Sequence, residues 1–193
     1  MNKEVSIIGA TINDIDEVMS LIRMIHAEIG IFELSDDCVR EVLLRALRPQ
    51  NPEGIVGIIR EKDGSIAALI FLMITRMWYS QQFHLEELLN FVHPDHRKSN
   101  YADALIRFAK HSADQLRIPL MIGILTRRQL EPKIRLYRRR LDMPVGAFFL
   151  YNAEYTDRSL NTDLWKHTRK RDSAPLPATA LATTMIAPSM VSN

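Results

Sequence analysis

The stretch that decides the fold is residues 91–102, FVHPDHRKSNYA. Its first residues are apolar and end a predicted strand, because Pro94 cannot continue the hydrogen bonds of a sheet. From residue 101 to residue 116, apolar side chains recur at a spacing of three and four, which predicts an amphipathic helix. Ser99 or Asn100 is suited to cap the start of that helix. The stretch therefore predicts a strand, a turn and a helix in succession.

The predicted turn has the features of an anion site. The first turn of a helix leaves backbone N–H groups unpaired, and the helix dipole places about half a positive charge there. Both favour a phosphate or pyrophosphate group, and Arg97 and Lys98 add formal charge. Glu86 and Glu87 lie just upstream, on the strand whose end faces the turn. An acid beside an anion site predicts group-transfer chemistry.

The rest of the chain supplies a mixed set of elements. Apolar periodicity and turn signals predict helices at 14–29, 35–47, 101–116 and 131–141, and strands at 5–10, 54–60, 65–75, 84–92, 119–126 and 146–152. The turn at 62–64 contains Gly64, as a hairpin requires. We expect an α/β fold with a mixed, largely antiparallel, twisted central sheet of about six to seven strands, flanked by about four helices.

A short motif in the turn resembles a known family. Arg97-x-x-Asn100-x-Ala102 is similar to the Arg/Gln-x-x-Gly-x-Gly/Ala acyl-CoA loop of the GNAT superfamily of N-acetyltransferases, with Asn100 in place of the first glycine. The order of elements over residues 4–153 is also similar to that of the superfamily. The resemblance implies the acyl-CoA N-acyltransferase fold and acetyl-CoA as cosubstrate. It places coenzyme binding on Asn90, Phe91, Val92, Arg97, Lys98, Ser99, Asn100, Tyr101 and Ala102.

The resemblance also implies the reaction, a direct transfer of an acetyl group to a primary amine of a small molecule or a protein. An amine with a pKa of about 10.4 must lose a proton before it attacks, so a base is needed. Glu86 is our candidate base, with Glu87 on the opposite face of the strand; a bulge would exchange the two. The alternative for Glu86 is an ordinary strand residue paired with an arginine.

The candidate acid is Tyr137, which the resemblance places near the sulfur of the coenzyme. Protonating the leaving thiolate helps the reaction forward. Two positions depart from the family pattern, Leu130 for an asparagine and Leu141-Asp142 for Gly-Phe. The alternative for Tyr137 is packing of an amphipathic side chain against the sheet.

The acceptor pocket is expected near the connection between the first two helices. Phe32 and Glu33 are candidates there, together with Trp78 and Tyr79, whose alternative is core and connection. No metal is expected, because His93 and His96 have no third ligand at a recognisable spacing.

Composition indicates one domain at 1–154, GNAT-like by resemblance, and a C-terminal extension at 155–193. The extension is basic and then uncharged, and is expected to be flexible or docked on a partner subunit. The chain contains no apolar run long enough to span a bilayer and no signal-peptide pattern, so we expect no membrane partner and a cytoplasmic location.

Charge suggests a function of another class. The net charge is +2, but residues 1–126 are acidic overall and residues 127–193 are basic, with five basic residues on one predicted helix: Lys133, Arg135, Arg138, Arg139 and Arg140. The alternative function is a scaffold with weakened catalysis that binds a protein or nucleic acid through this helix and the tail. Nucleic acid is not the expected partner, since no DNA- or RNA-binding motif is present. The resemblance makes a homodimer a reasonable expectation.

Overall fold

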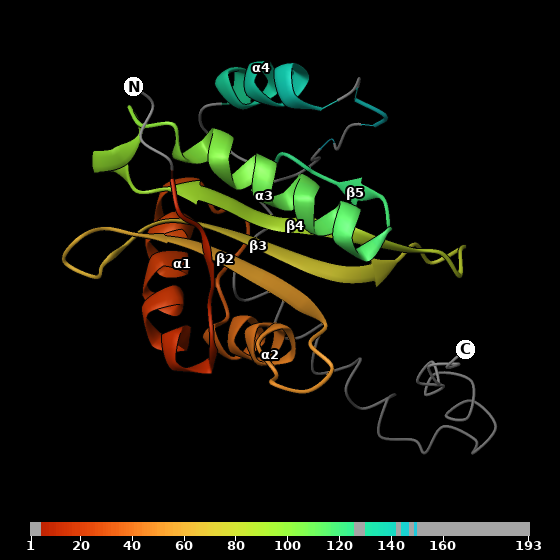
Figure 1. The fold of residues 1–193 in the computed structure, drawn as a ribbon, viewed down its shortest axis with the longest axis horizontal. Helices are drawn as coiled ribbons and strands as arrows, with labels where there is room; N and C mark the ends of the chain where they lie inside the picture. Colours follow the sequence, from red (N-terminus) through yellow and green to blue (C-terminus); the bar gives the residue numbers. More distant parts are fainter. Residues whose placement is uncertain (1–4, 126–129, 142–143, 147–148, 150–193) are drawn as a thin grey trace. The chain divides into compact units, whose positions relative to one another are not determined.

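The structure is a computed structural model that describes residues 5–125, 130–141, 144–146 and 149 (Figure 1). By its internal contacts the chain divides into two units, Met1–Phe148 and Phe149–Asn193. The predicted extension at 155–193 and most of the predicted strand at 146–152 lie outside the described residues.

The sheet is mixed and largely antiparallel, as predicted. Its strands follow one another in chain order, each antiparallel to the next, except that the last two are parallel. The described residues contain five strands rather than six to seven, and the first and last are shorter than predicted, because only two residues of each pair with a neighbour. The strands are β1 (Ile8–Gly9), β2 (Gly54–Arg60), β3 (Ile66–Arg76), β4 (Phe83–Val92) and β5 (Leu120–Met121).

Four α-helices flank the sheet, and all four were predicted. They are α1 (Ile15–Ile29), α2 (Asp36–Ala46), α3 (Tyr101–Leu116) and α4 (Leu130–Arg140), with short 3-10 turns η1 (Ile12–Asp14) and η2 (Pro94–His96). Ser35 caps α2, where its Oγ accepts a hydrogen bond from the backbone N–H of Cys38 at 3.3 Å. Asn100 is the N-cap residue of α3, but its side chain makes no capping bond.

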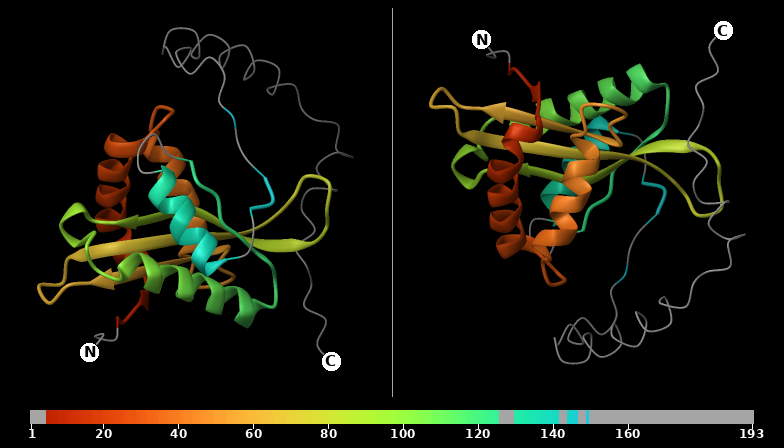
Figure 2. Two further views of the ribbon diagram at one scale, coloured as in Figure 1. Left: turned by 90° about the horizontal axis from the view of Figure 1, so that it is seen from above. Right: turned by 90° about the horizontal axis from the view of Figure 1, so that it is seen from below.

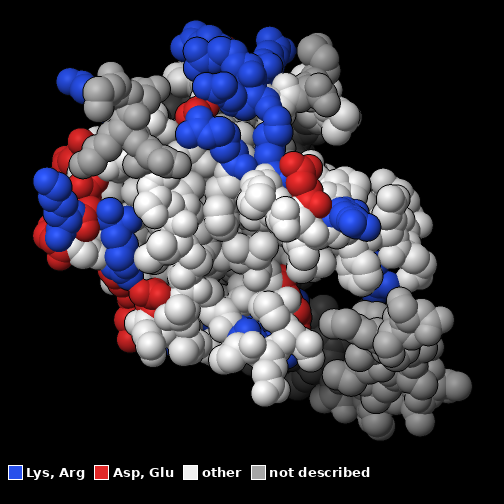
Figure 3. Space-filling model, viewed as in Figure 1, with Lys and Arg blue, Asp and Glu red and all other residues white. Residues whose placement is uncertain are grey.

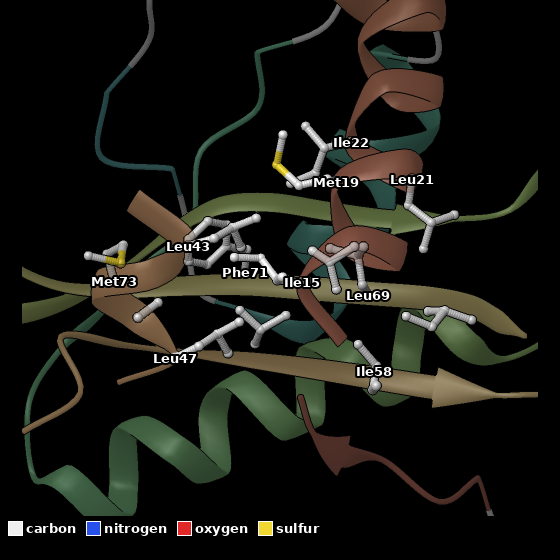
Figure 4. Packing of buried hydrophobic residues seen from close by; sticks show 14 residues of the cluster. Ile15, Met19, Leu21, Ile22, Leu43, Leu47, Ile58, Leu69, Phe71 and Met73 are labelled. Carbon is white, nitrogen blue, oxygen red and sulfur yellow. The ribbon is translucent and has the colours of Figure 1, made fainter. Parts of the chain in front are cut away.

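The helices cover the sheet from both sides (Figures 1 and 2). Helices α1 and α2 bury one face, where Leu43 of α2 lies beside Phe71 of β3 (Figure 4). Helix α3 buries the other face, where Leu105 belongs to the same buried cluster as Leu72 of β3. Burial of each such side chain stabilises the fold by about 1.5 to 3 kcal/mol. The apolar residues of β2 and β3 thus contribute to two core layers, one on each face of the sheet.

Strand β4 carries an irregularity that positions the site. Leu89 lies opposite Phe71 and Glu87 lies opposite Leu72, so Leu88 is an extra residue, a β-bulge. Strand β5 pairs with β4 only at Leu85 and Glu86. Beyond Glu86, that edge of β4 has no partner strand among the described residues.

Candidate active site

The bulge at Leu88 decides which carboxylate faces α4. In a regular strand Glu86 would lie on the same face as Asn90, four residues later. The extra residue changes this, so Glu87 shares the face of Asn90 instead, and Glu86 turns to the α1 and α2 side. There the Oε2 of Glu86 lies 3.9 Å from the Nε2 of His84.

Glu87 meets the other candidate residue, Tyr137. Tyr137 extends from α4 and is only 8% exposed. Its hydroxyl lies 3.3 Å and 3.5 Å from the two carboxylate oxygens of Glu87 and donates to them. The structure therefore brings Tyr137 to Glu87 and not to Glu86.

Burial sets the protonation of this pair. It raises the pKa of Glu87 from 4.5 to about 7, against the opposing effects of Lys133 and of the Tyr137 hydroxyl. Burial, together with the charge of Glu87, also raises the pKa of Tyr137, while the side-chain amide of Asn90 opposes this. Near neutral pH, Tyr137 thus keeps its proton and Glu87 can gain or lose one.

Along its free edge, strand β4 presents backbone groups that pair with no strand among the described residues. The N–H of His93 donates to the carbonyl oxygen of Ala67 in β3 at 2.8 Å. By alternation, the backbone N–H of Phe91 also faces β3, while those of Asn90 and Val92 face the free edge. Of the residues that the resemblance places at the coenzyme, Asn90 and Val92 therefore have backbone groups on this edge. Phe91 has its backbone committed to β3 and contributes its ring.

The turn before α3 presents backbone donors as well. Four N–H groups there donate to no described residue, those of Lys98, Asn100, Ala102 and Asp103. The N–H of Ser99 donates to His96, and that of Tyr101 donates to the Ser99 hydroxyl at 3.2 Å. Asn100 has φ −91° and ψ 15°, so the turn needs no left-handed residue where the family has glycine. Backbone donors of this kind at the start of a helix are suited to bind an anion.

Arg97 is turned away from these donors. Its guanidinium forms an ion pair with Glu28 of α1 and lies over the ring of Phe91, 5.7 Å from the ring centre. Its Nε also donates to the carbonyl oxygen of Val92 at 3.4 Å. In this conformation Arg97 links the end of β4 to α1.

A second set of contacts fastens the turn to the hairpin between β2 and β3. The hydroxyl of Tyr101 donates to Oε1 of Glu61 at 2.6 Å, and Nδ1 of His96 lies 3.4 Å from the same oxygen. The hydrogen bond to Glu61, followed by burial, raises the pKa of Tyr101. Tyr101 therefore holds the turn in place through its side chain.

The candidate acceptor residues separate into two places. Phe32 and Glu33 line a cavity of about 420 Å³ between α1, α2 and β4, together with Leu88, Leu89 and Leu125 among others. Trp78 and Tyr79 lie outside it, in the turn between β3 and β4, where they are 94% and 70% exposed. Their rings contact each other edge to face, so they form neither the predicted core nor a wall of this cavity.

Positive charge gathers over α4, as Figure 3 shows. Lys133 is partly buried near Glu87 and Glu28, and burial lowers its pKa. The arginines of the helix are exposed, and one of them, Arg140, forms an ion pair with Asp103 of α3. This pair places α4 against the start of α3, next to the free donors.

Sequence reasoning missed several of these partners. Glu28, Glu61 and Lys133 approach the predicted residues only through the fold; Glu28 is 69 positions from Arg97 in the chain. No spacing pattern could have revealed such pairs. Within the described residues, no three metal-binding side chains gather, and no helix is long and apolar enough to cross a membrane.

Comparisons with known proteins agree with this architecture. The model of the "Acetyltransferase (GNAT) family" matches residues 20–143. A ribosomal-protein-alanine N-acetyltransferase from Brucella melitensis biovar Abortus 2308 is similar in structure, with a TM-score of 0.57 and 18% identity over 77% of this chain and 99% of that one. An aminoglycoside antibiotic 6'-N-acetyltransferase from Acinetobacter baumannii has a TM-score of 0.57 and 10% identity over 77% and 97%. No curated protein matches the chain.

Proposed function

The chain belongs to the acetyltransferase (GNAT) family, and we propose that it transfers an acetyl group from acetyl-CoA to a primary amine by direct attack. The observation that carries this proposal is the contact of Tyr137 with Glu87 beside the free edge of β4. The coenzyme is a substrate with a diphosphate at one end and a thioester at the other. The chain offers groups suited to each.

The free donors of the turn suit the diphosphate. The N–H groups of Lys98, Asn100, Ala102 and Asp103 are fixed at the start of α3, where the helix dipole adds positive potential. The carboxylate of Asp103 in the same turn is balanced by ion pairs with Arg107 and Arg140. The site therefore favours an anion despite this acid.

The free edge of β4 suits the amide-containing arm of the coenzyme. An extended chain can pair with an exposed strand edge as an additional strand does. In this arrangement the N–H of Asn90 donates to the thioester carbonyl and stabilises the negative charge that develops on its oxygen.

Glu87 and Tyr137 then handle the protons. As the C–N bond forms and the C–S bond breaks, Glu87 takes the proton that the amine loses, and Tyr137 gives its own to the departing sulfur. The hydrogen bond between them returns a proton from Glu87 to Tyr137. A pKa of about 7 suits Glu87 to this task at neutral pH. The proposed base is therefore Glu87, one residue after the candidate predicted from the sequence, Glu86.

Two pairs of matched variants test the proposal. Ala102→Pro removes one N–H donor in the first helical turn, where proline is tolerated, and Ala102→Ser keeps it. We expect calorimetry to show CoA binding weakened at least about tenfold by the first change only. Glu87→Gln should lower the rate of acetyl transfer by about 100-fold or more, and Glu86→Gln should not.

The outcomes separate the possibilities. If calorimetry detects no CoA binding up to millimolar concentration, the proposed function is wrong. Salt-dependent retention of the same protein on heparin would then favour the non-catalytic scaffold with the basic helix α4. A loss of transfer in Glu86→Gln with normal transfer in Glu87→Gln would return the base to Glu86.

A further inference from the structure

The cavity of about 420 Å³ lies at the connection between α1 and α2, where the acceptor pocket is expected. Its floor is formed by Phe71 of β3 and Leu89 of β4, on the face that α1 and α2 cover. Leu88, the bulged residue, and Leu125, which follows β5, bring the cavity to the point where the two strands separate. Glu87 is the next residue along β4. The cavity and the Glu87–Tyr137 pair therefore lie on opposite faces of the sheet, near the residues where β4 and β5 stop pairing.

The lining of the cavity is almost entirely apolar. Ile, Val, Leu and Phe side chains from α1, α2, their connection and the sheet form most of it, and no lysine or arginine of the described residues lines it. The polar side chains present are those of His26, Glu33 and Cys38. The ring of His26 is already engaged, because its Nε2 lies against the carbonyl oxygen of Phe32 within hydrogen-bond distance.

This lining selects between chemical classes of amine. An amine with several ammonium groups would lose water in the cavity without gaining enough polar partners, which is costly. An amine attached to an aromatic or branched aliphatic group would bury that group among similar side chains, which is favourable. A volume of this size lies within the range of small-molecule sites.

We propose that the acceptor is a primary amine that carries a single apolar group, and that this cavity holds the apolar group while the amine reaches Glu87 past the residues where β4 and β5 stop pairing. The inference rests on the proposed function. It adds the substrate class, and it excludes polycationic amines as preferred acceptors.

The test compares amines of both classes as probes. Thiol release at saturating acetyl-CoA gives kcat/KM for 2-phenylethylamine, for the polar ethanolamine and for the polycationic kanamycin. Calorimetry with the CoA-bound protein measures binding of each amine without any need for turnover. We expect kcat/KM and affinity for 2-phenylethylamine to exceed those for the other two at least about tenfold, as differential burial of an apolar group predicts.

Two variants in α2 test whether the apolar group binds in this cavity. Val42→Phe in α2 fills part of the cavity, and Leu44→Phe changes a residue of the same helix that is outside it. Affinity for 2-phenylethylamine should fall about tenfold or more in Val42→Phe only, with the CoA affinity of both variants unchanged.

Each outcome bears on one proposal or the other. Preferred turnover of ethanolamine or kanamycin would overturn the inference and leave the proposed function standing. Binding of 2-phenylethylamine that Val42→Phe abolishes, without any acetyl transfer, would overturn the proposed function and support the cavity as a site for apolar amines. Absence of both binding and transfer would overturn both.

Discussion

Tyr137 and Glu87 each shift the pKa of the other, which affects the expected pH dependence of acetyl transfer. The Tyr137 hydroxyl lowers the pKa of Glu87 below the value that burial alone would give. We expect the rate to rise with pH through about 7, as Glu87 ionises. In Tyr137→Phe the residual activity should rise at a higher pH, because the donor to the carboxylate is lost. A pH–rate profile of both proteins measures the shift, and an unmoved acidic limb would contradict it.

The same carboxylate makes the folded protein less stable when it ionises. The pKa of Glu87 is raised from 4.5 to about 7 in the folded state. Its ionisation therefore leaves the free energy of unfolding unchanged below pH 4.5 and lowers it progressively as the pH rises to 7. The cost above pH 7 is at most about 3 kcal/mol. Glu87→Gln should therefore raise the melting temperature at pH 8 but not at pH 4.

A matched control is Glu86→Gln, which removes the same charge from the opposite face of β4. Equal gains at pH 8 in both variants would attribute the effect to net charge rather than to burial of Glu87. The two thermal unfolding curves at two pH values are sufficient to decide.

For Glu86 and Glu87, the sequence predicted a base on the strand but not which of the two faces α4. Adjacent acids on a strand face opposite ways, so a base on one face follows from alternation. The extra residue at Leu88 has no sequence signal, because Glu86-Glu87-Leu88-Leu89 reads as an ordinary strand. Only the register with β3 shows that Glu87, and not Glu86, lies on the same face as Asn90.

At the scale of elements, β2 and α3 depend on a glycine at their contact. A Cβ added to Gly57 would lie 2.6 Å from the ring of Phe108. Gly57→Ala should lower the free energy of unfolding by about 1 to 3 kcal/mol, because the ring must shift within a packed core. Chemical denaturation measures the loss.

Two further variants check the cause. Gly9→Ala in β1 should have little effect, since nothing lies within 4 Å of its added Cβ. Phe108→Leu combined with Gly57→Ala should recover part of the stability. A double variant that is as unstable as the sum of its parts would place the cost elsewhere.

Elements with strong periodicity were predicted well, and marginal strands were not. Helices α1 to α4 and strands β2 to β4 follow from regular apolar spacing and clear turns. Residues 5–10 and 119–126 have the composition of strands, but pairing depends on a neighbour, and only two residues of each find one. Local sequence does not contain that information.

For the molecule as a whole, the ion pair of Arg97 with Glu28 connects α1 to the turn before α3, where we propose that the diphosphate binds. An anion that recruits Arg97 must compete with Glu28. Glu28→Gln should therefore increase the affinity for CoA severalfold, an effect that added salt reduces. Asp36→Asn is the control, because it removes a carboxylate of α2 that pairs with Arg23 instead. Unchanged or weaker CoA binding in Glu28→Gln would show that Arg97 acts where it now lies.

The family and the general fold could be predicted from the turn motif and the order of elements. The partners of Arg97, Tyr101 and Glu87 could not, because they come from α1, the β2–β3 hairpin and α4, which are distant in the sequence. Long-range contacts of this kind are set by packing rather than by local pattern.

The edge of β4 that pairs with no described strand beyond Glu86 also matters for handling the protein. Exposed strand edges are templates on which a second molecule can align and begin to aggregate. A ligand that occupies residues 87–92 would cover that template. Concentrated stocks should accordingly remain clear for longer, by light scattering, when CoA is included from the first purification step.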